Sequence, residues 1–293
     1  MRTAQRLQAP AKLNLTLEVL EPRADGYHGV RSLMVPLDLC DEFEISPAAN
    51  FHFECDRPSL RDDNLALAAF DALGSRPNAA ITLRKAIPVR AGLGGGSSDA
   101  AAVLLAAMSG SFGPPGDRDW LAIARSLGSD VPFFLAGSGA LVEGTGERVT
   151  AVGALPDWHV LVVKPPVGVS TADAYARIDA AQRPARPRNT SVTLRALNAL
   201  QRGDFDGVSR CLSNDFQDVV AAAEPAVARA LAALAEAGAA APLLAGSGAC
   251  VFALTRTAAQ RDEISARLQL PDEFARLATR FRQAAAWRGS VPA

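Results

Sequence analysis

The sequence predicts an α+β fold arranged in two domains, and three observations lead to this prediction. The chain has 293 residues, enough for two ordinary domains that each bury a core. In the N-terminal half, β-rich runs come first and helical segments follow, without the regular strand and helix alternation of a parallel α/β sheet. At Trp158 the pattern begins again with a buried strand. We therefore place the boundary at Leu155 to Asp157, between domains of residues 1–157 and 158–293.

The first half is predicted from runs rich in β-branched and aromatic residues. These runs predict strands at Arg6 to Gln8, Lys12 to Leu20, Val35 to Leu39, Phe43 to Ile45, Phe51 to Cys55 and Ile81 to Arg84. Acidic residues or serines, which favour helix N-termini, precede two of the predicted helices. The helices are predicted at Asp63 to Leu73, Ser98 to Ser109 and Asp119 to Leu127, and strands at Gly139 to Glu143 and Arg148 to Val152 follow them.

The second half opens with HVLVVKP, His159 to Pro165, a buried strand that ends at two prolines. A loop rich in Pro and Arg, Ala181 to Asn189, comes next. Helices are predicted at Val192 to Gln201, Asp204 to Leu212 and Pro225 to Ala237, the last of them stopped by Gly238. A second glycine loop, Leu243 to Cys250, then leads into a strand that begins at Val251.

Composition and charge exclude several classes of protein. A net charge of −1 provides no bulk attraction to nucleic acid or to an anionic membrane. No apolar run approaches the roughly 20 residues that span a bilayer, and the N-terminus lacks the apolar core of a signal peptide, so we expect a cytoplasmic protein. The cysteines, Cys40, Cys55, Cys211 and Cys250, lack the spacing of a zinc site or a disulfide framework and are predicted to be free thiols.

The most informative segment is PVRAGLGGGSSDAAA, Pro88 to Ala102, which predicts a phosphate-binding loop. Glycines let the backbone approach a ligand closely, and the first N–H groups of the following helix have no partner within the helix. Together with the helix dipole, these donors attract an anion. The carboxylate of Asp99 does not fit this picture, because it would itself occupy part of the positive field.

Three other interpretations of this loop can be tested against the residue types. A Walker A loop requires Lys and then Ser or Thr after its last glycine, whereas Ser97 follows Gly96 directly. A dinucleotide-binding fingerprint requires a third glycine at the position of Ser97. A turn that only caps the helix would need less flexibility than four glycines in five residues provide. Only three of the 30 basic residues are lysines, and the others are arginines. Lys12, Lys85 and Lys164 are therefore candidates for positions that need a compact ammonium group.

Several motifs together resemble the GHMP family of small-molecule kinases. These are PAKLNL with ADGYH in the first 30 residues, GLGGGSSDAA, GSDVPFF, ALVEGTGE, NDF and GSGACVFA, and they run through nearly the whole chain. The combination of ADGYH with GLGGGSSDAA is similar to the members that act on a cytidine-diphosphate-linked methylerythritol. The resemblance implies a two-domain α+β kinase fold with the active site in the cleft between the domains. It also implies transfer of the ATP γ-phosphate to the 2-hydroxyl of that small-molecule substrate, in non-mevalonate isoprenoid biosynthesis, with no nucleic-acid or membrane partner.

The resemblance also implies roles for particular residues. Lys12 and Asp130 match the catalytic pair, Asn14, Tyr27 and His28 match substrate-binding positions, and Tyr175 would supply a second aromatic face for the cytosine. The ATP phosphate loop would consist of Pro88, Val89, Arg90, Ala91, Gly92, Leu93, Gly94, Gly95, Gly96, Ser97 and Ser98. Phosphoryl transfer depends on positioning and charge neutralisation, so Asp130 would accept the hydroxyl proton or orient the hydroxyl, beside the Lys12 ammonium. Mg²⁺ is inferred from the chemistry of ATP, since no acidic residue is an obvious metal ligand.

Each assignment has a structural alternative. Lys12 would then be a charge at a strand edge, Asp130 a helix cap or turn residue, and Tyr27 and His28 ordinary loop residues. Asn214, Asp215 and Asp218 would be a solvated helix face, and Arg90 departs from the small residue common in the family. Three other functions remain open: a homoserine or mevalonate kinase, a non-catalytic nucleotide-binding protein and, weakest, an NAD-dependent oxidoreductase.

Overall fold

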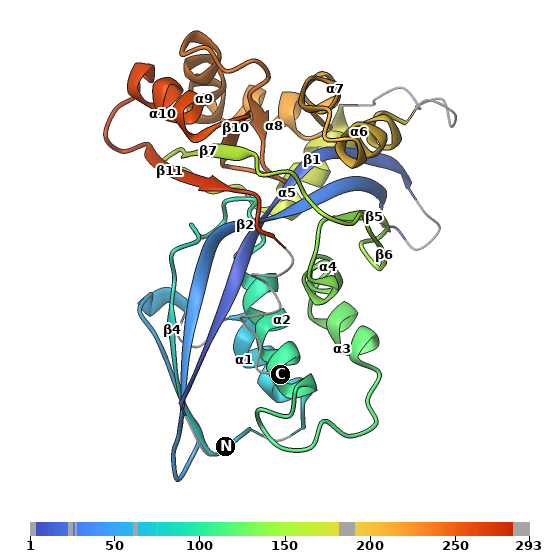
Figure 1. Cartoon of the computed structure of the whole chain (residues 1–293), viewed down its shortest axis with the longest axis vertical. Coiled ribbons are helices and arrows are strands. Elements are labelled where there is room, and N and C mark those ends of the chain that lie inside the picture. The colour runs from blue at the N-terminus through green and yellow to red at the C-terminus, as the bar shows by residue number, and fades with distance from the viewer. Residues whose placement is uncertain are drawn as a thin grey trace.

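The computed structural model describes residues 4–22, 26, 28–60, 64–74, 76–181 and 191–283. Three of the predictions reach other residues: Tyr27, Asp63 at the start of the first predicted helix, and most of the Ala181 to Asn189 loop lie outside the described part. Within it, helices and two mixed or antiparallel sheets confirm the α+β prediction (Figure 1).

Two long strands form the middle of the first sheet. β1 (Gln5–Pro22) and β2 (His28–Pro47) pair antiparallel along almost their whole length, and Figure 1 shows the pair crossing from the lower part of the molecule to the upper part. The sequence predicted four shorter strands here, which was wrong. The ladder continues past Pro10 because a register shift between Pro10 and Lys12 accommodates the proline, which has no N–H to donate.

The first sheet has the order β3-β4-β2-β1-β8, and β5 and β6 join it through β2. Its further strands are β3 (His52–Cys55), β4 (Ala79–Arg84), β5 (Ala140–Gly144), β6 (Arg148–Ala151) and the short β8 (Ser213–Asn214). The helical elements of this half are η1 (Pro58–Leu60), α1 (Leu65–Ala72), α2 (Gly95–Met108), α3 (Trp120–Leu127) and α4 (Val131–Ala136). Of these, η1 and α4 were not predicted, because three and six residues are too few to show a helical period.

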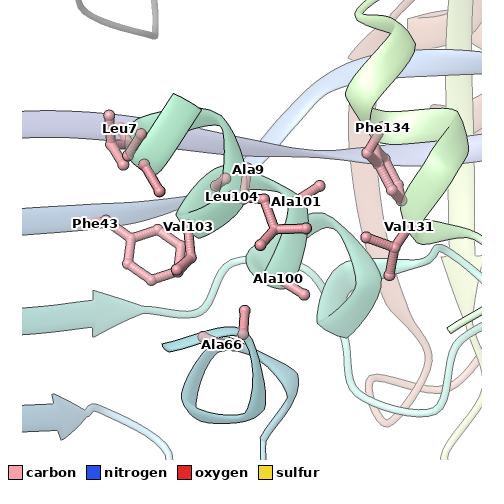
Figure 2. Close-up of a cluster of buried hydrophobic side chains, with 14 of the residues drawn as sticks. Leu7, Ala9, Phe43, Ala66, Ala100, Ala101, Val103, Leu104, Val131 and Phe134 are labelled. Carbon is pink, nitrogen blue, oxygen red and sulfur yellow. The ribbon is translucent and has the colours of Figure 1, made fainter. Parts of the chain in front are cut away.

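Small side chains on α2 let it pack closely between α1 and the sheet. Figure 2 shows Ala100 facing Ala66 of α1, while Val103 lies beside Phe43 of β2. All of these residues are fully buried. Because α2 begins directly after the glycine loop, this packing fixes where the loop lies in the molecule.

The second sheet is antiparallel, with the order β11-β7-β10-β9. Its strands are β7 (His159–Lys164), β9 (Leu243–Leu244), β10 (Val251–Thr255) and β11 (Ala275–Arg280). The helices around it are α5 (Thr171–Ala180), α6 (Val192–Gln201), α7 (Phe205–Cys211), α8 (Gln217–Ala223), α9 (Pro225–Glu236) and α10 (Ala258–Arg267). The sequence predictions omitted α5, α8, α10, β11 and the short β9, which lies where a glycine loop was predicted, whereas α6, α7 and α9 are confirmed to within a residue or two.

The two halves of the chain share buried contacts. β8 pairs with β1 through Leu17 and Asn214, and one apolar cluster contains Leu13 and Val35 together with Trp158 and Phe281. The predicted boundary at residues 155–157 falls between β6 and β7 and stays a prediction. In the part of the chain that the structure describes, no helix is both long and apolar enough to cross a membrane.

Candidate active site

A cavity of about 1250 Å³ is lined by residues from both halves of the chain. This volume exceeds the 300 to 1,000 Å³ common for pockets that hold a single small ligand. Lys12, Asn14, His28, Asp130 and Tyr175 all line it, although they come from widely separated parts of the sequence. The predicted phosphate loop lines it from Pro88 to Ser97, whereas Ser98 is buried beneath the loop and is not part of the lining.

Lys12 and Asp130 face each other inside this cavity. The Lys12 side chain is only 5% exposed, and its Nζ lies 3.5 Å from Oδ2 of Asp130, whose side chain is 33% exposed. Lys12 is not a charge protecting an open strand edge, because its side chain is buried and its backbone N–H donates to the Leu93 carbonyl. Asp130 precedes α4, but its side chain makes no capping hydrogen bond. Asp130 does occupy the N-cap position of α4, within a turn, but its carboxylate is directed to Lys12 and makes no cap bond.

A chain of hydrogen bonds holds Lys12 in place. Its Nζ donates to Oδ1 of Asn14 at 2.6 Å, and Nδ2 of Asn14 donates to Ser32 Oγ at 2.8 Å. Ser32 in turn donates to the backbone carbonyl of Thr16 at 2.6 Å. Because all of these groups are buried, the ammonium has a defined direction toward Asp130. Asn14 thus positions Lys12 in addition to lining the cavity.

The two glycine loops touch each other at the floor of the cavity. A Cβ built on Gly92, where φ is +75°, would lie 1.8 Å from the Ala245 carbonyl oxygen. Cys250 N–H donates to Ala91 O at 3.1 Å, which ties the loops further. Gly246, Ser247 and Gly248 of the second loop line the cavity. Only glycine permits this close approach.

The first glycine loop ends in the N-terminus of α2. Gly94, with φ of +72°, is the N-cap residue, and a Cβ there would lie 2.9 Å from Lys12 Cγ. The predicted helix start at Ser98 was three residues late, since α2 begins at Gly95. The N–H groups of Gly95, Gly96 and Ser97 precede the first bond of the helix ladder, from Ser98 N–H to Gly94 O. They provide the donors that an anion in the cavity requires.

Asp99, which did not fit the anion-binding picture, belongs to a buried ionic triad. Lys85 Nζ donates to both Asp41 Oδ2 and Asp99 Oδ2. Burial raises the pKa of Asp99 well above its usual value, although the Lys85 charge acts in the opposite direction. Lys85 is therefore paired with two carboxylates. Lys164, the third lysine, donates to the carbonyls of Pro165 and Val167 and is not part of the cavity lining.

Two aromatic rings lie on one wall of the cavity. His28 and Tyr175 stack with their ring centroids 5.6 Å apart, and Tyr175 meets Phe216 edge to face at 4.9 Å. Burial, and secondarily the charge of Asp130, raises the pKa of Tyr175 to about 12, so its hydroxyl stays neutral at physiological pH. His28 contacts Leu20 O through Nδ1 and Asp179 Oδ1 through Nε2, each at 2.8 Å. A ligand that pairs with Nε2 must therefore compete with Asp179.

The NDF segment buttresses the second glycine loop. Asn214 donates through Nδ2 to the carbonyls of Leu244 and Gly246, at 2.8 and 2.7 Å. Asp215 accepts from Val19 N–H at 2.8 Å. Both side chains are buried, so a solvated face is the wrong description for them, whereas Asp218 is exposed. The sequence offered no signal for these partners, because they lie about 30 or 200 residues away.

The described residues contain no group of three or more His, Cys, Asp or Glu side chains that could hold a metal ion. Nearby, the buried hydroxyl of Ser98 has no hydrogen-bond partner among these residues. Mg²⁺ bound to nucleotide phosphates takes few protein ligands, and one or two oxygen atoms suffice. Among the described residues the side chains therefore offer no ready-made metal cage, and a magnesium ion at the cavity would take its ligands mainly from phosphate oxygens and water.

Comparison with known proteins gives consistent results. The model of the GHMP kinase N-terminal domain matches residues 64–138, and that of the C-terminal domain matches residues 196–272. The chain is 42% identical over 268 residues to the 4-diphosphocytidyl-2-C-methyl-D-erythritol kinase of Deinococcus radiodurans, covering 89% of this chain and 87% of that one. It is 39% identical over 277 residues to the kinase of the same name from Pelotomaculum thermopropionicum, covering 90% and 94%.

Solved structures extend this similarity to the fold. A crystal structure of a 4-(cytidine 5'-diphospho)-2C-methyl-D-erythritol kinase superposes with a TM-score of 0.76 at 32% identity, covering 95% of this chain and 100% of that one. Mevalonate kinase from L. major superposes at 0.70 with 15% identity, covering 97% and 98%. At that level of identity the second match supports the fold alone.

Proposed function

This chain belongs to the 4-diphosphocytidyl-2-C-methyl-D-erythritol kinases of the GHMP kinase family, and from this premise we propose how its residues carry out the reaction. ATP is the phosphoryl donor in this family. The acceptor is the 2-hydroxyl of 4-diphosphocytidyl-2-C-methyl-D-erythritol, and the products are its 2-phosphate and ADP. The reaction belongs to non-mevalonate isoprenoid biosynthesis.

The single observation that carries the residue assignment is the pairing of Lys12 with Asp130 at 3.5 Å, beside the first turn of α2. The O–H bond of the acceptor breaks as its oxygen attacks the γ-phosphorus, and the bond from that phosphorus to the β-phosphate oxygen breaks as ADP leaves. Asp130 accepts the hydroxyl proton or orients the hydroxyl. Lys12 neutralises charge on the transferring phosphoryl group, in a reaction that depends mainly on positioning and electrostatics.

Each substrate has its own part of the cavity in this proposal. The backbone N–H groups of Gly95, Gly96 and Ser97 hold the ATP phosphates, at the positive end of α2. Tyr175 provides a flat apolar face for the cytosine. His28 provides a ring nitrogen, Nε2, for the edge of the base, and the cytosine then replaces Asp179 as the partner of that nitrogen. Tyr27 is proposed as the second stacking face from the sequence motif alone.

The metal ion in this proposal is Mg²⁺, which would neutralise phosphate charge when bound with ATP. Phosphate oxygens and water would supply most of its ligands, because Mg²⁺ bound with nucleotide phosphates takes few ligands from the protein. We also propose a cytoplasmic location. The support is that Cys40, Cys55, Cys211 and Cys250 are free thiols, as is usual in a reducing compartment.

A ³¹P NMR assay tests the proposal directly. The purified protein is mixed with Mg-ATP and, in separate samples, with 4-diphosphocytidyl-2-C-methyl-D-erythritol, homoserine or mevalonate. We expect a new phosphomonoester signal together with ADP in the first sample only. Phosphorylation of homoserine or mevalonate instead would overturn the substrate assignment, and intact ATP in all samples would support a non-catalytic nucleotide-binding protein.

A further inference from the structure

The buried triad of Asp41, Lys85 and Asp99 lies directly beneath the phosphate loop and plays no part in the reaction as described above. Lys85 and Asp99 also line the cavity, although both side chains are almost completely buried. The three residues come from different elements: Asp41 from β2, Lys85 from the segment after β4, and Asp99 from α2. The triad therefore joins the main sheet to the chain on both sides of the loop.

The segment that enters the loop is attached to Asp41. Oδ1 of Asp41 accepts hydrogen bonds from the backbone N–H groups of Ala86 and Ile87, at 2.7 and 2.8 Å. Lys85 itself is fixed through its backbone, which donates to Asp56 Oδ1 at 3.0 Å. The chain is thus held at three successive residues immediately before Pro88, where the loop begins.

The helix that leaves the loop is attached through Asp99. Its carboxylate accepts from Lys85 Nζ, which also donates to Asp41. The first residue of α2 lies directly over this attachment, since a Cβ built on Gly95 would be 3.1 Å from Ile87 Cγ2 and 3.5 Å from Asp41 Oδ2. Entry and exit of the loop are therefore clamped to the same ammonium group.

This clamp is electrostatically costly. Two carboxylates and one ammonium leave a surplus negative charge in a buried place, and Oδ1 of Asp99 has no hydrogen-bond partner among the described residues. Burial raises the pKa values of both Asp41 and Asp99, which means that the ionised carboxylates are disfavoured there. A buried ion pair of this kind contributes little to net stability, because the cost of desolvation offsets most of the attraction between the charges. The positive end of α2 offsets part of the surplus charge.

We propose that Asp99 is a positioning residue for ATP, acting through Lys85 and Asp41 to hold the phosphate loop in its binding conformation. The proposal rests on the proposed function, because it concerns affinity for the nucleotide. Asp99 does not touch the substrates in this account. Its effect is to keep the N–H groups of Gly95, Gly96 and Ser97 pointing to one place before ATP arrives, so that binding does not have to order the loop.

The test compares Asp99→Leu and Asp99→Asn with the parent protein. Leucine keeps the volume but removes the contact to Lys85, whereas asparagine keeps an oxygen that accepts from Lys85. Dissociation constants for Mg-ATP are measured by calorimetry without acceptor, and KM for the acceptor is measured separately. Asp204→Asn serves as a control, because it changes a carboxylate that caps α7 and does not line the cavity.

We expect Asp99→Leu to raise the dissociation constant for ATP about tenfold, which is a modest effect on the scale of affinities, while KM for the acceptor changes less than about twofold. Asp99→Asn should give a smaller increase, and Asp204→Asn none. The melting temperature of both Asp99 variants should stay the same or rise, because a disfavoured buried charge is removed. Hydrogen exchange should become faster in residues 86–98 of Asp99→Leu but not in β7.

The outcomes separate this proposal from the function itself. If the parent protein does not bind ATP, the proposed function fails. If the parent binds ATP and Asp99→Leu binds it equally well, the positioning role is refuted. The role is also refuted if the affinity loss appears only together with a lower melting temperature and a parallel rise in KM for the acceptor, since that pattern indicates general misfolding. Should Asp99→Leu fail to fold, the same criteria apply to Asp99→Asn.

Discussion

Gly92 of the first glycine loop lies against the carbonyl group of Ala245 in the second, so closely that a Cβ at residue 92 would be 1.8 Å from that oxygen. Two segments far apart in the chain thus meet at the cavity. The contact is possible only because residue 92 is a glycine and has no Cβ. The same loop contains a natural control. A Cβ on Gly96 would come no closer than 3.6 Å to Leu65.

Gly92→Ala should therefore destabilise the protein and weaken ATP binding. An alanine at residue 92 would overlap the Ala245 carbonyl group and would have to adopt a positive φ. We expect the free energy of unfolding to fall by about 1 to 3 kcal/mol or more. Gly96→Ala, within α2, should be neutral or stabilising by up to about 1 kcal/mol. Urea denaturation measures both. Equal stability of the two variants would show that the loops separate easily.

Arg90 combines a strained backbone with a free charge at the cavity. Its φ is +51°, its side chain is exposed and lines the cavity, and no hydrogen bond or ion pair of its guanidinium is found among the described residues. Arg90→Gly should raise stability by about 1 kcal/mol, because glycine adopts positive φ without strain. Arg90→Gln keeps the strain and removes only the charge.

Both Arg90 variants should weaken ATP binding by a few-fold and reduce its dependence on salt, whereas only Arg90→Gly should melt at a higher temperature. Calorimetric titration at two salt concentrations and a thermal scan distinguish these effects. Unchanged ATP affinity in both variants would mean that the guanidinium does not reach the phosphates.

Tyr175 should control affinity for the acceptor and not for ATP. Stacking of a base on an aromatic side chain contributes about 1 to 3 kcal/mol, so Tyr175→Ala should raise the dissociation constant for the acceptor by roughly 10- to 100-fold. Tyr175→Phe keeps the ring and its contact with Phe216 and should bind nearly as well as the parent. Fluorescence titration with the acceptor measures this, and a similar loss for ATP would place the cytosine elsewhere.

Asp99 predicts a pH dependence of stability with a definite sign. Burial raises its pKa in the folded protein above the value in the unfolded chain, with Asp41 acting in the same direction and Lys85 opposing it. The folded state therefore binds the extra proton more tightly, and this stabilisation is present at low pH and lost as pH rises through the raised pKa. Asp99→Asn has no carboxyl group to ionise at this position, so its stability does not fall in this way as pH rises.

The variant should accordingly be more stable than the parent at pH 8, and the difference should shrink as pH falls toward 4. Melting temperatures of the two proteins across this range provide the measurement. A difference that grows at low pH would mean that the Asp99 carboxylate is stabilised in the folded state.

The sequence motifs indicated the site better than they indicated the fold around it. Lys12, Asp130 and the glycine loop were predicted as one constellation, and they line one cavity. The lengths of β1 and β2 were not predictable from local pattern, because Pro10 marks a strand end unless a register shift accommodates it. α4, with six residues, is too short to show a period. Its position is set by tertiary packing, for example of Phe133 and Phe134 in the core.

The buried triad was beyond the reach of sequence patterns for a different reason. Asp41, Lys85 and Asp99 lie on three elements, and no spacing rule connects them. Two weak signals were present: the rarity of lysine in this chain, and the misfit of an acidic residue in the first turns of an anion-binding helix. Both pointed to unusual residues, but only the three-dimensional structure shows that they are partners.

The central claim is that Asp130, paired with Lys12, acts on the acceptor hydroxyl. Rapid-quench measurement of a single turnover, with enzyme in excess over acceptor and with Mg-ATP saturating, compares the parent with Asp130→Asn. The variant should fold normally, since Asp130 makes no cap bond, and bind both substrates like the parent. Asp119→Ala is a control for loss of stability without loss of activity, because it removes the cap bond to Ala122 of α3. It should lose about 1 kcal/mol of stability and keep its turnover. We predict that transfer by Asp130→Asn is slower by about 10² to 10⁴-fold. A rate within a few-fold of the parent would contradict both roles proposed for Asp130, as base and as orienting group.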